Sequence, residues 1–205
     1  MISKRSVKIL MMRKKKEENF MAKKGFTLLE LLIVIGILAI LTAAVVVVLN
    51  PAQLLAQARD SQRLSDLASV QSAINLFLAT ATSTDLETGP YATANATCGF
   101  TSTTTCTVST STAVNGTGWV RVELTRASGG SPLAVLPLDP TNTATYQYAY
   151  IANDNYDTFE LDARLESEKY RNRMTNDGGS ANVCGVNYND TTCWYEVGND
   201  PGLNL

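Results

Sequence analysis

The chain has 205 residues, of which 45% are hydrophobic, and its formal net charge is −2. This length suits one globular unit with an accessory segment rather than two domains. Residues 1–25 carry nine basic and two acidic residues, whereas the rest of the chain carries eight basic and seventeen acidic ones. The acidic balance of the main part excludes direct nucleic-acid binding through bulk charge.

An apolar helix is predicted directly after the basic segment. Residues 26–49 read FTLLELLIVIGILAILTAAVVVVL, and at about 1.5 Å per residue such a helix crosses roughly 30 Å of hydrocarbon. A basic flank before a membrane helix is retained in the cytoplasm, so we expect the acidic remainder to be exported. Cleavage by a signal peptidase is disfavoured, because no suitable site follows the apolar run before Pro51.

Glu30 is the one charged residue of this apolar run. A carboxylate inside a spanning helix costs about 2.5–3.5 kcal/mol on insertion scales and therefore needs a partner. Cleavage after Gly25 would create an ammonium group at Phe26, four residues before Glu30 and on the same helix face. The two charges could neutralise each other within one chain or, preferably, between neighbouring chains. The alternative is an interfacial carboxylate near the end of the helix.

The sequence KKGFTLLELL at residues 23–32 resembles the cleavage and methylation motif of type IV prepilins, which type II secretion pseudopilins share. The resemblance implies that a membrane prepilin peptidase cuts after Gly25 and N-methylates Phe26. It also implies that Glu30 docks the subunit into a filament of its own copies or of other pilins. The remaining partners implied are the inner membrane and the assembly platform of a pilus or secretion system.

Two features depart from the usual pattern of that family. The leader of residues 1–25 is long, and a start at Met21 would shorten it to a common form, so both Met1 and Met21 fit the motif. The helix-breaking proline lies at Pro51, later than is usual, and proline removes a helical hydrogen bond. We therefore expect the helix to be interrupted at the membrane boundary.

An amphipathic helix is predicted after Pro51. Its apolar residues recur at helical spacing and are expected to pack on a sheet: Leu64, Leu67, Val70, Ile74, Phe77 and Leu78. Its charged residues are expected on a solvated face, where they pair with one another or bridge subunits: Arg59, Asp60, Arg63 and Asp66.

The head begins with a Thr-rich and Ser-rich stretch, residues 80–118, that is predicted to be a surface loop. Alternating or aromatic-rich segments predict strands of an antiparallel sheet at Trp119–Leu124, Tyr146–Ile151 and Thr158–Leu165, with a last strand near Cys193–Val197. The expected fold is α+β and similar to that of pilins, with a long N-terminal helix packed on a small antiparallel sheet. The expected segments are a cleaved leader, an assembly helix, an amphipathic helix and a head, at residues 1–25, 26–50, 51–79 and 80–205.

Four cysteines fall in two close pairs, Cys98 with Cys106 and Cys184 with Cys193, in the part expected outside the cytoplasm. Two local disulfide bonds are predicted, although three pairings are formally allowed. A zinc site is excluded, because the sequence has no CxxC motif and no histidine.

The head sequence indicates a structural role rather than an enzyme. It contains no histidine, no Gly-rich phosphate loop after a strand and no recognisable nucleophile motif. No cofactor is expected apart from calcium, for which Asp154, Asn155 and Asp157 offer hard oxygen ligands in an expected turn. That segment lacks the glycine and glutamate of an EF-hand loop. A membrane-tethered binding domain is a further alternative, but it leaves Glu30 unexplained.

Overall fold

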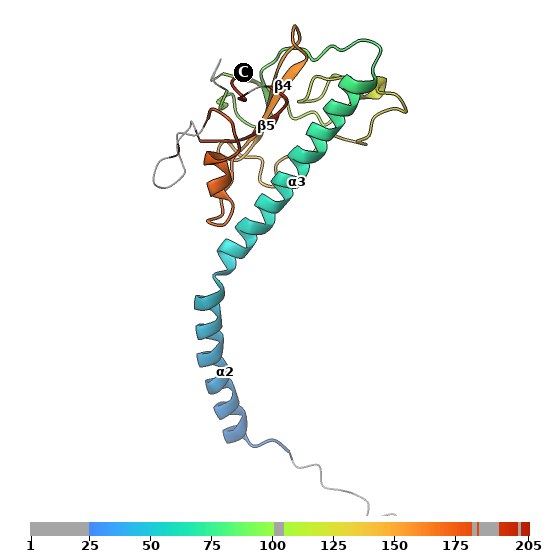
Figure 1. Ribbon diagram of the computed structural model, residues 1–205. Helices are drawn as coiled ribbons and strands as arrows, with labels where there is room; N and C mark the ends of the chain where they lie inside the picture. The colour runs from blue at the N-terminus through green and yellow to red at the C-terminus, as the bar shows by residue number, and fades with distance from the viewer. Residues whose placement is uncertain (1–24, 101–104, 182–183, 185–192, 201) are drawn as a thin grey trace, which may run out of the picture. The chain divides into compact units, whose positions relative to one another are not determined.

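The computed structural model describes residues 25–100, 105–181, 184, 193–200 and 202–205 (Figure 1). The chain divides into two compact units, Met1–Leu49 and Asn50–Leu205. The structure contains both α-helices that the sequence predicted, one in each unit.

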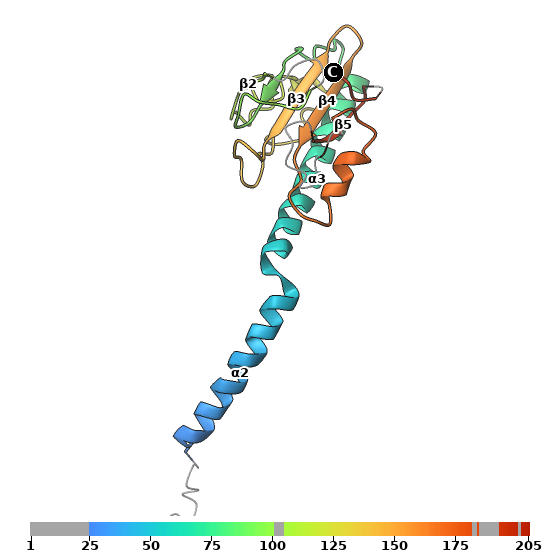
Figure 2. The same ribbon diagram turned by 90° about the vertical axis from the view of Figure 1, so that its left-hand side faces the viewer.

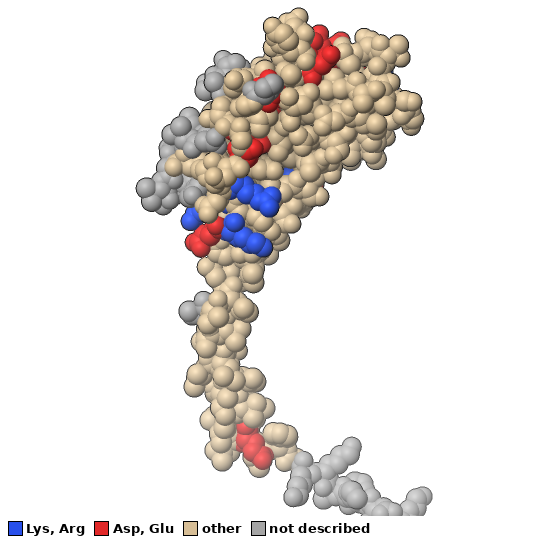
Figure 3. All heavy atoms as spheres, in the orientation of Figure 1, with Lys and Arg blue, Asp and Glu red and all other residues tan. Residues whose placement is uncertain are grey.

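The first unit contains α2, which spans Leu28–Leu49. Its Leu28–Val46 portion is long and apolar enough to cross a membrane, and none of it is buried within the chain. The face of α2 visible in Figure 3 carries one acidic patch and no basic one among its described residues. The sequence assigns that patch to Glu30, because α2 has no other acidic residue.

The helix is interrupted at Asn50, as the neighbouring proline predicted. Asn50 has a left-handed φ of 40°, and Pro51 has no amide hydrogen with which to continue α2. A second helix, α3, then begins at Pro51 and runs to Thr80. The Asn50 side chain caps this helix by accepting a hydrogen bond from the Gln53 amide at 3.4 Å.

The apolar stripe of α3 packs on one face of the sheet, which lies in front of the helix in Figure 2. Four of the six predicted stripe residues are fully buried: Leu67, Val70, Ile74 and Phe77. The other two, Leu64 and Leu78, are half-buried at the margins of the core. Because burying each such side chain stabilises the fold by about 1.5–3 kcal/mol, this stripe is a main attachment of α3 to the head.

In the described part of the head, five strands form one sheet in the order β2-β1-β3-β4-β5. Their bounds are Tyr91–Ala92 for β1, Thr107–Val108 for β2, Tyr148–Asn153 for β3, Thr158–Ala163 for β4 and Tyr195–Gly198 for β5. β3 lies antiparallel to β1 and β4, and β5 lies antiparallel to β4, but β2 lies parallel to β1. The sheet is therefore mixed, and the prediction of a wholly antiparallel sheet is wrong at this edge. The two parallel strands are separated in sequence by residues 93–106, of which 101–104 lie outside the described residues, and this range falls within the stretch predicted as loop.

The segment 119–124, predicted as a strand, is irregular and runs into the 3-10 helix η1, Leu124–Arg126. The prediction is wrong because Trp119 and the adjacent Val120 are both fully buried, which alternation on a half-buried strand would not allow. The segment instead fills the core, and the indole nitrogen of Trp119 donates a hydrogen bond to the carbonyl of Pro137 at 2.9 Å.

Both faces of the sheet are covered. Opposite α3, a second apolar cluster includes Phe100, Ala149, Ile151 and the disulfide bond between Cys98 and Cys106. A third cluster surrounds Met174 of the 3-10 helix η2, Arg171–Thr175, and includes the disulfide bond between Cys184 and Cys193. The structure thus contains both local pairings that the cysteine spacing predicted.

Candidate assembly site

The first turn of α2 is built on a reciprocal capping arrangement between Thr27 and Glu30. The Glu30 amide donates to the Thr27 hydroxyl at 3.2 Å, while the Thr27 amide and hydroxyl donate to Oε2 of Glu30 at 3.0 and 2.8 Å. This capping box satisfies amides that would otherwise lack partners at the helix start. These bonds hold the carboxylate of Glu30 beside Thr27, the residue that follows Phe26.

Sequence reasoning assigned Glu30 a partner at Phe26 and missed Thr27. The T-x-x-E spacing before an apolar run is the signal that could have revealed it, because that pattern marks a helix N-terminus. Only Oε2 of Glu30 takes part in these bonds; no described residue donates to Oε1. One carboxylate oxygen is therefore left for a group outside the helix.

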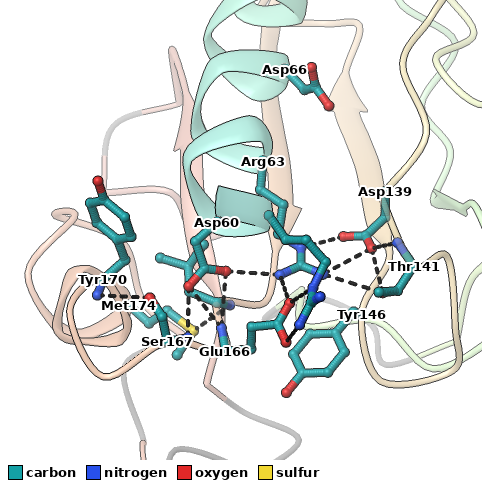
Figure 4. A network of polar contacts seen from close by, with 12 residues as sticks. Asp60, Arg63, Asp66, Asp139, Thr141, Tyr146, Glu166, Ser167, Tyr170 and Met174 are labelled. Carbon is teal, nitrogen blue, oxygen red and sulfur yellow. Dashed lines mark hydrogen bonds and ion pairs between the residues drawn. The ribbon is translucent and has the colours of Figure 1, made fainter. Parts of the chain in front are cut away.

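A second polar site lies at the start of the head, where α3 contributes Arg63 (Figure 4). Arg63 is fully buried, and its guanidinium bonds to three carboxylates. Its Nε lies 2.6 Å from Asp139, and its Nη1 lies 2.8 Å from Asp60 and 2.7 Å from Glu166. The ring of Tyr146 covers the guanidinium at 4.8 Å from its centroid.

The carboxylates of this network bind the loops on either side of α3. Asp60 accepts hydrogen bonds from the amides of Glu166 at 3.1 Å and Ser167 at 2.7 Å, just after β4. Asp139 accepts from the amide of Thr141 at 2.8 Å, before β3. The network therefore ties α3 to two segments that are remote from it in sequence.

The expectation of a solvated charged face on α3 is wrong for Asp60 and Arg63, which are both fully buried. The predicted (i, i+3) pair does form between them, at 2.8 Å, but inside the protein. Arg59 is partly exposed and makes a bidentate pair with Glu166, with both distances 2.7 Å. Asp66 points away from the network in Figure 4 and accepts from the hydroxyl of Tyr148 at 2.9 Å.

The charges of the network shift the pKa values of its members. Burial alone would lower the pKa of Arg63, but the hydrogen bonds and charge of Asp139, with the bonds to Glu166 and Asp60, raise it above its ordinary value. Burial would raise the pKa of Asp139, but bonding to Arg63 lowers it instead. The pKa of Glu166 is lowered in the same way, against its burial, by Arg59 and Arg63. Both carboxyls are therefore ionised near neutral pH.

These pKa shifts predict a loss of stability in acid. The ordinary pKa values of Asp139 and Glu166 are 3.8 and 4.5, and the folded values lie below them. Their contribution is therefore complete above about pH 5 and is lost as the pH falls through the folded values. Unfolding of the full chain in detergent, followed against pH, should show this decline. Glu166→Gln should flatten it, and an acid profile identical to that of the unaltered chain would contradict the assignment.

The calcium candidates of the sequence lie in the turn between β3 and β4, where Asp154 and Asp157 have separate roles. Asp154 accepts a hydrogen bond from the Leu86 amide at 3.0 Å. Asp157 adopts a positive φ of 53°, and its carbonyl accepts from the Asn199 side chain at 2.9 Å. Asn155 donates its amide to Asn153 at 3.2 Å. A calcium site in this turn stays a prediction.

A membrane-length helix whose first turn holds a lone carboxylate, followed by a helix packed on a small sheet, defines a helix-anchored α+β protein of the pilin-like class. A family model described as the prokaryotic N-terminal methylation motif matches residues 20–46. The chain thus carries the signature of type IV prepilins and pseudopilins, and its α+β fold is pilin-like. No curated protein and no solved structure matches the chain.

Proposed function

We propose that the chain is a structural subunit of a type IV pilus filament. Prepilin peptidase cuts it after Gly25 and methylates the new amine of Phe26, and α2 then assembles with α2 of other copies or of other pilins. The role is structural rather than catalytic, as in the family whose motif the chain carries. The observation that carries the proposal is Glu30, a lone carboxylate held at the start of an uncharged helix, beside the cleavage point.

The chemistry of the cut explains why that carboxylate is tolerable in lipid. Cleavage gives Phe26 a positive charge one residue before Thr27, whose amide already contacts Glu30. A Phe26 ammonium of a neighbouring chain can pair with the same carboxylate when two helices pack together. Since packing between helices replaces packing against lipid, the removal of unpaired charge favours the filament over the dispersed subunit.

The charge distribution supports a defined topology for the subunit before assembly. The basic segment of residues 1–25 remains in the cytoplasm, α2 crosses the inner membrane, and the acidic head lies outside. Contact with the assembly platform then extracts the helix into a filament at the cell surface. Adhesion, motility or DNA uptake would be activities of the filament rather than of the single chain.

A type II secretion pseudopilin is the second candidate, because its N-terminal signature is shared with the pilins. The disulfide-closed segment between Cys184 and Cys193 and the long Thr-rich segment of the head support a pilin, whose surface is exposed outside the cell. A membrane-tethered binding domain is the remote alternative. It gives no reason for Glu30 in α2.

Mass spectrometry of filaments sheared from the cell surface tests the proposal. We expect an abundant chain that begins at N-methylated Phe26 and lacks residues 1–25. A control with Gly25 altered should yield no such terminus. Processed chain found only in the membrane fraction would instead favour the pseudopilin, and an unprocessed chain would contradict both.

A further inference from the structure

Three acidic side chains meet on the face of the sheet opposite α3. Glu160 and Asp162 lie on β4, and Glu196 lies on β5 directly opposite Asp162 in the strand register. Their neighbours Phe159 and Leu161 point into the core beneath α3, so alternation directs the carboxyls to the other face. Other segments cover this face, so Glu160 and Asp162 are 0% exposed and Glu196 is 1% exposed. One carboxylate oxygen from each of the three residues lies within 4.8 Å of the other two.

Protein groups satisfy only part of this acidic cluster, Glu160, Asp162 and Glu196. The two oxygens of Glu196 accept from the amides of Ser180 at 3.3 Å and Ala181 at 2.8 Å. One oxygen of Glu160 accepts from the Leu205 amide at 3.1 Å. Within the described part of the chain, neither oxygen of Asp162 has a hydrogen-bond partner, nor has Oε1 of Glu160.

The charged groups around the acidic cluster add to its negative charge. Asp177 lies beside Glu196 and accepts from its amide at 2.9 Å. Asp200 contributes further repulsion to Glu160. Arg164 directly follows β4, and its guanidinium lies over the Trp194 ring, 5.6 Å from the centroid.

Three buried carboxylates are costly unless protons or a cation neutralise them. Burial, opposed in part by hydrogen bonds, raises the pKa of Glu160 to about 7 and that of Glu196 to about 8. Burial and the charge of Glu160 raise the pKa of Asp162 well above its ordinary value. The fold therefore holds three buried carboxyl groups close together, and three of their oxygens have no hydrogen-bond partner in the described part of the chain.

We propose that Glu160, Asp162 and Glu196 bind a Ca²⁺ ion between β4 and β5. Carboxylate oxygens are the ligands that Ca²⁺ prefers, and its irregular coordination of six to eight oxygens suits a site assembled from two strands and adjoining backbone. The acidic cluster has no thiolate or imidazole that would select zinc or copper. The site is distinct from the turn that contains Asp157, and the inference does not depend on the filament role.

Calorimetry and thermal unfolding of the full chain in detergent, after treatment with a chelator, test this site. We expect Ca²⁺ to bind with a Kd on the order of 10⁻⁴ M, as in other extracellular modules. At a hundredfold excess over Kd it should raise the unfolding temperature by about 5–10 °C. Binding should release protons, so the measured heat should differ between buffers of unequal ionisation enthalpy.

Asp162→Asn separates ion binding from general stability. It should abolish the Ca²⁺ response, yet in chelator the variant should unfold at a temperature equal to or higher than the unaltered chain, because it removes a buried carboxyl that Glu160 and Glu196 repel. Asp157→Asn is the matched control and should keep the full response, since asparagine tolerates the positive φ of that position. Glu160→Gln serves as a second variant if Asp162→Asn does not fold.

The proposal is overturned by any of three results. The first is an unfolding temperature that Ca²⁺ does not change. The second is a response that Asp157→Asn removes and Asp162→Asn keeps, which would place the ion in the turn. The third concerns the loss of stability that is expected as the pH rises through the raised pKa values. If Ca²⁺ does not reduce this loss, protons alone neutralise the acidic cluster.

Discussion

Replacing Glu30 with alanine is expected to exclude the chain from filaments while leaving its expression and membrane insertion intact. The alanine helix inserts more readily, but it cannot pair with the Phe26 ammonium of a neighbour. Because an unpaired charge in lipid costs about 2.5–3.5 kcal/mol, loss of the pair should reduce incorporation by more than about tenfold. Quantitative mass spectrometry of sheared filaments, normalised to the membrane-bound precursor, measures this ratio.

The capping contacts of Glu30 require controls that separate its two roles. Glu30→Gln retains a residue suited to the capping box but removes the charge, whereas Thr27→Ala removes the cap and retains the charge. We expect Glu30→Gln to fail like Glu30→Ala, and Thr27→Ala to assemble with a smaller loss. If Glu30→Gln enters filaments normally, charge pairing with Phe26 is not required for assembly. The helix cap alone would then account for Glu30.

Replacing Arg63 with methionine should be among the most destabilising changes in the head. The substitution keeps much of the side-chain volume but leaves Asp60, Asp139 and Glu166 buried or nearly so, without their shared cation. Breaking a buried pair from one side typically costs about 3–5 kcal/mol. The unfolding temperature of the full chain should therefore fall by roughly 6–20 °C.

Arg126 offers the matched control for this substitution. Its guanidinium is 42% exposed and lies 3.9 Å from Glu123, so the pair is weak and screened by solvent. Arg126→Met should change the free energy of unfolding by no more than about 0.5 kcal/mol. A fall for Arg63→Met as small as that of the control would mean that the buried network contributes little to stability.

The sequence predicted α3 and its packing residues correctly but assigned its charged residues to the wrong environment. Arg63 precedes Leu67 by four residues and Asp60 precedes it by seven, so both lie on the extension of the apolar stripe. Helical periodicity alone therefore placed them toward the head. The prediction of a solvated face instead followed the general rule that charged residues lie at the surface. Asp139, the partner of Arg63, could not be predicted because it is 76 residues away in sequence.

The acidic cluster on β4 and β5 shows a different limit of prediction. Alternation correctly separates Phe159 and Leu161 from Glu160 and Asp162, and such a pattern usually means that one face is solvated. Here the second face is covered by remote segments, among them Phe100 and the C-terminal Leu205. No local pattern reports that cover, so burial of these acids follows only from the tertiary structure.

The position of Arg63 and Asp60 near the start of α3 has a mechanical consequence. If the chain is a pilus subunit as proposed, tension on its N-terminal helix would reach the head through the N-terminal half of α3. Asp60 and Arg63 join those turns to the segment after β4 and to the loop before β3 by several short bonds. Because these bonds reach two segments that are remote from α3 in sequence, pulling α3 away from the head requires breaking bonds to both segments.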